Sequence, residues 1–390
     1  MRGIRIGSAF GIPIKLDLTF LVVLPLFAWL IGSDVAQLTA LVNDLFGSTI
    51  DGAALATPPT QWILGSAAAI GLFLGVLLHE FGHSLVAMRY GYTIESITLW
   101  LFGGVARFTD IPEDWKQELT IAIAGPVVSV LIGIVSYAGF VAVPSSLPQF
   151  KFVLGYLALM NITLAVFNML PGFPMDGGRV LRALLARTRP HAKATQMAAE
   201  VGKVFAFLLG IFGLFFNLFL VALAFFIYIG ASGEAQQSVL KATFQDVVVR
   251  DIMTARENLS TVEEETSVAD LLQQMFVERH TGYPVLRNGD LVGMVTLDDA
   301  RSVREVERDA YRVEDVMSDE LATITPDADA MDAIALMQER GVGRLPVVDD
   351  DGVLVGLVSR SDLVTAFNII RSRGSLDAMP RPDSGLISPR

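Results

Sequence analysis

The sequence of 390 residues contains no cysteine, few charged residues and only four histidines. The absence of cysteine excludes a disulfide framework, iron–sulfur clusters with thiolate ligands and thiolate zinc sites. Charged residues make up 18% of the chain and hydrophobic residues 52%, and the mean hydropathy is +0.52. A composition this apolar excludes a disordered or fibrous chain and disfavours a purely soluble enzyme.

Charge is distributed unevenly along the chain. Residues 1–240 hold 13 basic and 13 acidic side chains, whereas residues 241–390 hold 16 basic and 28 acidic ones and account for the net charge of −12. A neutral apolar half joined to an acidic half predicts a domain embedded in membrane lipids, over residues 1–235, followed by a soluble one. We expect no nucleic-acid partner.

Six apolar runs in the first half approach the ~20 residues that a helix needs to cross the ~30 Å hydrocarbon core. They are residues 16–31, 62–88, 119–143, 152–170, 197–211 and 217–231. The last two are predicted to be separate spans, because one helix over both would far exceed the bilayer thickness. One long span is the alternative.

Basic residues in the connections predict the orientation of these spans. The N-terminus and residues 89–118 and 171–195 contain Lys or Arg, whereas residues 33–61 and 212–216 contain none. Lys151, at the edge of an uncharged connection, is the one exception. Since basic connections remain in the cytoplasm, we expect a multi-pass protein of the cell membrane with both termini cytoplasmic.

An internal repeat occupies the second half, with an offset of 62–64 residues. Asp251-Ile-Met-Thr recurs as Asp315-Val-Met-Ser, and Gly293-Met-Val-Thr-x-x-Asp recurs as Gly356-Leu-Val-Ser-x-x-Asp. Helical runs and short apolar strands after Asn-Gly and Asp-Gly turns predict the order β-α-β-β-α in each unit.

This repeat resembles tandem cystathionine-β-synthase-type (CBS) domains, which we assign to residues 245–308 and 309–372. Residues 373–390 are expected to form a disordered tail. The resemblance implies a site for an adenine nucleotide (ATP, ADP or AMP), with hydroxyls meeting phosphate and carboxylates meeting ribose. The matching residues here are Thr296, Asp299, Ser359 and Asp362. The alternative is that the repeats serve only to form a homodimer.

Two histidines form the motif His79-Glu80-Phe-Gly-His83 inside the second predicted span. On a helix, residues i and i+4 share a face, so both imidazoles can bind one metal ion. Glu80 then lies beside the ion as a general base for its water. Ionisable groups inside a span cost about 2.5 kcal/mol or more each, so three together favour a function over a chance match.

A catalytic zinc ion needs a third protein ligand and one open position. The best candidate is Asp176, which follows two helix-breaking prolines, Pro171 and Pro174, after the fourth span. The second and fourth spans both run from outside to inside, so Asp176 and the histidines are expected at a similar depth. An ordinary Asp-Gly-Gly turn is the alternative for Asp176.

These motifs resemble the site-2 protease family of intramembrane zinc metalloproteases. Gly125-Pro-Val-Val-Ser129 matches that family's G-x-x-x-[NSG] signature, although Ser129 alone is typical of a small helix-packing residue. Residues 101–105, Leu-Phe-Gly-Gly-Val, resemble its membrane-inserted β segment, with a simple turn as the alternative. The resemblance implies one Zn²⁺ per chain and regulated intramembrane proteolysis of transmembrane protein substrates. It also implies that Asn168 assists the substrate or the oxyanion.

Two further functions fit part of this pattern. A nucleotide-gated transporter or channel would spread polar residues over several spans, whereas intramembrane charge here concentrates at the HExxH motif and Asp176. An inactive membrane scaffold would not need Glu80. We therefore expect a zinc metalloendopeptidase with a multi-pass α-helical membrane domain and an α/β pair of CBS domains.

Overall fold

The structure is a computed structural model that describes residues 3–100, 103–108 and 114–377. The chain divides into two compact units, Met1–Ser238 and Val239–Arg390. The boundary falls within the long helix α9 (Leu218–Thr243), near the predicted end of the membrane domain at residue 235.

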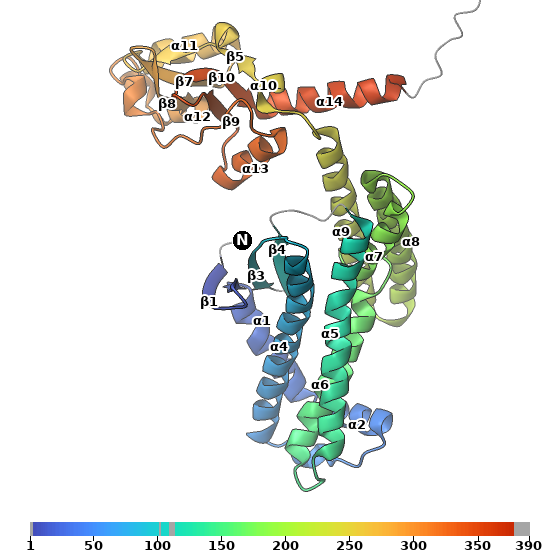
Figure 1. Cartoon of the computed structure of the whole chain (residues 1–390). Helices are drawn as coiled ribbons and strands as arrows, with labels where there is room; N and C mark the ends of the chain where they lie inside the picture. The colour runs from blue at the N-terminus through green and yellow to red at the C-terminus, as the bar shows by residue number, and fades with distance from the viewer. Residues whose placement is uncertain (1–2, 101–102, 109–113, 378–390) are drawn as a thin grey trace, which may run out of the picture. The chain divides into compact units, whose positions relative to one another are not determined.

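Within the described residues, five helices of the first unit are long and apolar enough to span a membrane. They are α4 (Thr60–Arg89), α5 (Trp115–Ala142), α6 (Pro148–Asn168), α8 (His191–Phe216) and α9. Figure 1 shows α4, α5 and α6 running together along the length of this unit. These three helices contain the second, third and fourth predicted spans almost completely. The expected multi-pass helical architecture is confirmed.

The first predicted span, residues 16–31, is wrong at its start. Leu16 belongs to strand β2 (Ile12–Asp17), and helix α1 (Phe20–Ser33) begins four residues later. At 1.5 Å per residue α1 is only about 21 Å long, which is short of the hydrocarbon core. A bend of 71° separates it from α2 (Val35–Phe46), and the pair forms a sixth candidate span. Apolar composition alone did not distinguish the strand from the helix.

The last two predicted spans are separate helices, as expected, but both are longer than predicted. Helix α8 begins at His191 rather than at residue 197, and α9 continues to Thr243 rather than 231. They run antiparallel: a Cβ added at Gly202 would lie 3.5 Å from Ala231, and one at Gly210 would lie 3.5 Å from Ala224. The turn falls at Asn217, whose side chain accepts a hydrogen bond from the Phe219 N–H.

A four-stranded sheet lies at the end of the first unit opposite α2 (Figure 1). Its order is β1 (Gly3–Ala9), β2, β3 (Ile94–Trp100) and β4 (Gly103–Phe108), which makes β4 an edge strand. The predicted β segment at 101–105 thus falls on β4, except that residues 101–102 lie outside the described residues. The hairpin of β1 and β2 was not predicted.

The second unit contains two small sheets, one for each repeat. The first repeat has the predicted order β6 (Val262–Glu263), α11 (Val268–Glu278), β7 (Gly282–Arg287), β8 (Asp290–Thr296) and α12 (Leu297–Ser302). The second has α13 (Ala330–Arg340), β9 (Arg344–Val348), β10 (Leu354–Ser359) and α14 (Arg360–Asp377). In place of its first strand, Ile324 forms a single bridge with Val347. The expected α/β architecture is confirmed.

The two repeats exchange their first segments. Strand β5 (Thr254–Ala255), from the start of the first repeat, pairs with β10 of the second. A Cβ added to Gly356 would lie 2.7 Å from the sulfur of Met253. In the same way, a Cβ added to Gly293 would lie 2.4 Å from the sulfur of Met317. The repeated Asp-x-Met and Gly-h-h motifs therefore contact each other across the repeats. The ranges 245–308 and 309–372 consequently interleave in space.

The predicted tail begins later than residue 373, because α14 continues to Asp377. Residues 378–390 lie outside the described residues.

Candidate metal centre

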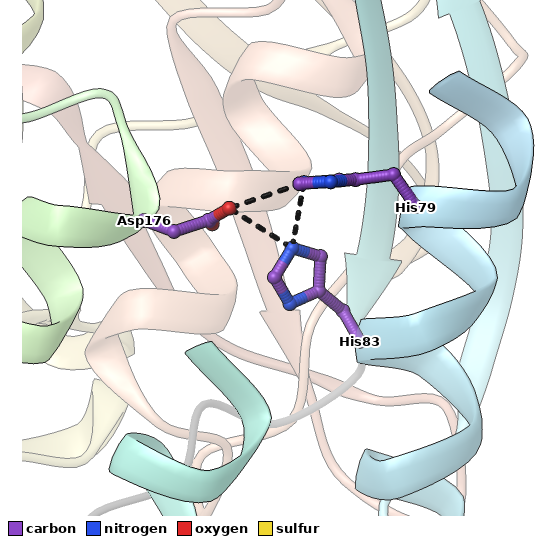
Figure 2. Close-up of side chains that lie close together, drawn as sticks. All are labelled: His79, His83 and Asp176. Carbon is purple, nitrogen blue, oxygen red and sulfur yellow. Dashed lines mark hydrogen bonds and ion pairs between the residues drawn. The ribbon is translucent and has the colours of Figure 1, made fainter. Parts of the chain in front are cut away.

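His79 and His83 lie one turn apart on α4 and point to the same side of the helix (Figure 2). Both are buried, with 3% of each residue exposed. Their Nε2 atoms are 3.1 Å apart. The expected i, i+4 arrangement of the two imidazoles is present.

Asp176 is the first residue of α7 (Asp176–Ala186) and is 7% exposed. The two glycines after it let the start of α7 approach the preceding segment closely. A Cβ on Gly177 would lie 2.2 Å from the Leu170 carbonyl oxygen, and one on Gly178 would lie 2.6 Å from the carbonyl carbon of Gly172. Backbone-to-backbone packing of this kind is possible only for glycine, so it directs the Asp176 carboxylate towards α4.

The three side chains converge on one point (Figure 2). Oδ2 of Asp176 lies 3.1 Å from Nε2 of His79 and 3.1 Å from Nε2 of His83. A tetrahedral zinc ion with bonds of about 2.1 Å holds its ligands about 3.4 Å apart, which is close to these separations. Two imidazole nitrogens and a carboxylate oxygen are also typical zinc donors, so the residues fit the ion that the sequence predicts.

Helix α5 orients both imidazoles. Nδ1 of His83 lies 2.7 Å from the Ile121 carbonyl oxygen, which can only accept, so Nδ1 carries the proton and Nε2 carries the lone pair. Nδ1 of His79 lies 2.8 Å from Oγ of Ser129. The carbonyl acceptor fixes the tautomer of His83, and the serine hydroxyl fixes the orientation of the His79 ring. Ser129 was expected mainly as a packing residue, and its contact with His79 was not predicted.

Gly125, between Ile121 and Ser129 on the same face of α5, makes room for the site. A Cβ at this position would lie 2.2 Å from Nε2 of His83. The spacing Ile121, Gly125, Ser129 is i, i+4, i+8, which already places the three residues on one helix face. That periodicity is the signal from which the contact of Ser129 with the site could have been predicted.

Glu80 lies next to His79 on α4 and faces the edge strand β4. A Cβ on Gly104 would lie 2.4 Å from Cγ of Glu80 and 3.2 Å from its Oε1. The glycine therefore provides the space that the Glu80 side chain occupies. Asn168, the last residue of α6, is partly buried, and its Nδ2 donates to the Leu164 carbonyl oxygen at 3.0 Å.

The four predicted nucleotide residues pair within each repeat. Oδ2 of Asp299 accepts from the Thr296 N–H and hydroxyl, at 2.8 and 2.6 Å. Oδ2 of Asp362 accepts equivalently from Ser359, at 2.8 and 2.7 Å. In both repeats the hydroxyl also accepts the N–H of the aspartate, which caps the following helix. The repeated motif therefore has a structural role at the starts of α12 and α14.

Comparison with known proteins agrees with this fold. Residues 67–149 and 145–209 match Peptidase family M50, and residues 249–305 and 313–369 match the CBS domain. The chain is 34% identical over 374 residues to the zinc metalloprotease MJ0392 of Methanocaldococcus jannaschii, covering 96% of this chain and 98% of the relative. It is 30% identical over 387 residues to Rip3 of Mycobacterium tuberculosis, covering 94% and 93%.

Among solved structures, the chain is similar to a site-2 protease from Methanocaldococcus jannaschii, with 35% identity and a TM-score of 0.40. The match covers 60% of this chain and 95% of that one. The chain belongs to the site-2 protease family, Peptidase family M50, and is a membrane-spanning zinc metalloprotease with a pair of CBS domains. This membership decides against the transporter or channel alternative.

Proposed function

We propose that the protein hydrolyses peptide bonds within transmembrane segments of membrane proteins, using one zinc ion held by His79, His83 and Asp176. The observation that carries this proposal is the burial of these three converging groups on and beside membrane-spanning helices. A site among helices that can span a membrane is accessible to a substrate that also lies in the membrane.

The residues of the chain have distinct tasks in this reaction. When bound, zinc supplies Lewis acidity, which lowers the pKa of water and polarises the scissile carbonyl group. Glu80 removes the proton from the attacking water and returns it to the leaving amine. Ile121 and Ser129 hold the histidine rings by Nδ1, which would leave both Nε2 atoms free to bind the ion. We assign Asn168, the last residue of α6, to the substrate or the oxyanion.

Strand β4 is suited to bind the substrate. A transmembrane helix must unwind before its peptide bonds can be attacked, and an edge strand can pair with the extended chain. One edge of β4 pairs with β3, where Gly104 lies opposite Leu99. The other edge of β4 has no partner strand among the described residues. Because Gly104 also contacts Glu80, a peptide paired with β4 would pass the proposed general base.

The function is tested with purified protein and a reporter protein that has one transmembrane segment, both in lipid vesicles. We expect zinc-dependent cleavage at bonds inside the transmembrane segment, located by mass spectrometry of the products. A chelator should abolish the cleavage and added zinc should restore it. Cleavage confined to soluble parts of the reporter would contradict the proposal.

We further propose that both termini and the CBS pair are cytoplasmic. Lys151, the exception in the charge pattern, donates to the carbonyl oxygens of Phe140 and Val143 at 3.0 and 3.2 Å. Its charge thus caps the end of α5, where cations are favourable, and does not need to face the cytoplasm. A C-terminal tag should therefore be protected in intact cells, whereas a tag inserted within residues 33–61 should react from outside. The reverse labelling pattern would refute this orientation.

We propose that the CBS pair binds an adenine nucleotide and that binding regulates proteolysis. The motif occurs twice with the same local geometry, at Thr296 with Asp299 and at Ser359 with Asp362. Hydroxyl groups can donate to phosphate, and carboxylates can accept from ribose hydroxyls. A bound nucleotide would change activity only if it favoured one arrangement of the protein over another.

Calorimetric titration of the full-length protein with ATP, ADP and AMP tests this site. We expect at least one to bind, and Asp299→Ala or Asp362→Ala to weaken binding by about tenfold or more, as loss of hydrogen bonds to a charged group predicts. Asp270→Ala is the matched control, because Asp270 pairs with Ser267 in a similar cap on α11 outside the motif. Absence of binding by all three nucleotides would contradict the proposed site and favour the alternative, in which the repeats serve to form a homodimer. Phe276 and Val277 on α11 offer an exposed apolar surface for such a contact.

A further inference from the structure

Arg182 on α7 is the centre of a buried cluster of charged side chains. The residue is 4% exposed. Its Nε donates to Oε1 of Glu118 on α5 at 2.5 Å, and its Nη1 donates to Oε1 of Glu234 on α9 at 2.5 Å. The guanidinium group also lies 5.1 Å from the centre of the Phe173 ring. A single cation thus connects three helices, and the proposed reaction uses none of these groups.

The forked, planar guanidinium group of Arg182 is essential to this arrangement. A guanidinium group presents several donors in a fixed plane and can hold two carboxylates at once, whereas a lysine ammonium is a point charge on a flexible stem. His191 on α8 lies beside the cluster, with Nε2 3.5 Å from Oε2 of Glu118. Burial of these charges is favourable only while each keeps its partners.

The cluster is connected to the metal ligands through two helices, α7 and α5. Arg182 lies six residues after Asp176 on the same short helix, which is about 9 Å along its axis. Glu118 and Ile121 lie three residues apart on α5. The carbonyl oxygen of Ile121 orients His83. The Arg182–Glu118 ion pair therefore joins the helix that carries the third ligand to the helix that orients the histidines.

Glu234 connects the same arginine to α9. This helix continues to Thr243, past the end of the first unit at Ser238 and into the second. The Glu234 side chain is 33% exposed, whereas that of Glu118 is 5% exposed. The bond to Glu234 is therefore the more accessible of the two and can be changed with less disturbance of the interior.

We propose that Arg182 is a positioning residue that fixes Asp176 relative to His79 and His83. Through Glu234, it makes the metal affinity depend on the position of α9, the helix that leads to the CBS pair. This inference rests on the proposed metal site. It identifies a route by which the second unit can act on that site.

The test measures metal binding rather than proteolysis. Full-length metal-free protein is titrated with Co²⁺ alone, and the visible absorption of the bound ion reports both affinity and coordination geometry. Glu234→Gln should weaken Co²⁺ binding about tenfold, at the lower end of the range for residues that support metal ligands. The matched control is Glu200→Gln on α8, which removes a carboxylate from an exposed ion pair with Lys203 and should leave Co²⁺ binding unchanged.

Arg182→Lys shows whether the effect passes through the arginine. This variant keeps the charge but loses the fork, so it should also bind Co²⁺ about tenfold more weakly, and adding Glu234→Gln should cause little further loss. Equal affinities of Glu234→Gln and Glu200→Gln would overturn the inference, even if Arg182→Lys failed to fold. Losses that multiply in the double variant would also overturn it. Failure of the wild type to bind Co²⁺ would instead refute the metal site.

Discussion

Glu80→Gln protein is expected to bind zinc like the wild type and to cleave its substrate about 10²–10⁴-fold more slowly. Glutamine keeps the size of the side chain in the space beside Gly104 but cannot accept the proton of the attacking water. The three proposed ligands are unchanged in this variant. The measurement pairs zinc content by elemental analysis with the initial rate of reporter cleavage.

Replacement of a ligand should give a different result. His79→Ala or Asp176→Ala removes one of three converging donors, so bound zinc should be lost together with activity. Glu80→Gln thus separates proton transfer from metal binding. Full zinc content in His79→Ala protein would exclude the proposed ligand set, and full activity in Glu80→Gln protein would exclude the general base.

The proximity of the ligands could be predicted from sequence because each step depended on a simple constraint. The spacing of His79 and His83 fixes their common face once the segment is helical. A catalytic zinc ion needs a third protein ligand, and Asp176 was the candidate after a proline-broken span. The structure brings these three residues together. Hydropathy also located α4, α5 and α6 to within about four residues, whereas α8 and α9 extend beyond their predicted bounds.

Other features depended on contacts that sequence spacing does not express. Leu16 is apolar in both a strand and a span, so composition extended the first helix into β2. Arg182 is one of the basic residues in the connection 171–195, and from the sequence these residues predicted only the membrane orientation. Its partners, Glu118 and Glu234, are 64 and 52 residues away in the sequence. Met253 and Met317 were recognised as repeat markers, but their exchange between repeats required the structure. Long-range partners of this kind cannot be assigned from one sequence.

Gly104→Ala is expected to reduce kcat about 10²-fold while leaving bound zinc unchanged. The added Cβ would lie 2.4 Å from Cγ and 3.0 Å from Cδ of Glu80, so the carboxylate must move. A displacement of about 1 Å in a reacting group is enough for a loss of this size. Zinc should remain, since Glu80 is not a proposed ligand.

The matched control is Gly7→Ala on β1, the opposite edge strand of the same sheet, where an added Cβ meets no atom within 4 Å. This variant should retain the wild-type kcat, which separates a general effect of alanine on the sheet from displacement of Glu80. Measurement of kcat and KM with the reporter distinguishes the possible roles of Gly104. A raised KM with unchanged kcat would mean that the glycine makes room for the substrate strand rather than for the general base, and the proposed contact with Glu80 would then have no catalytic consequence.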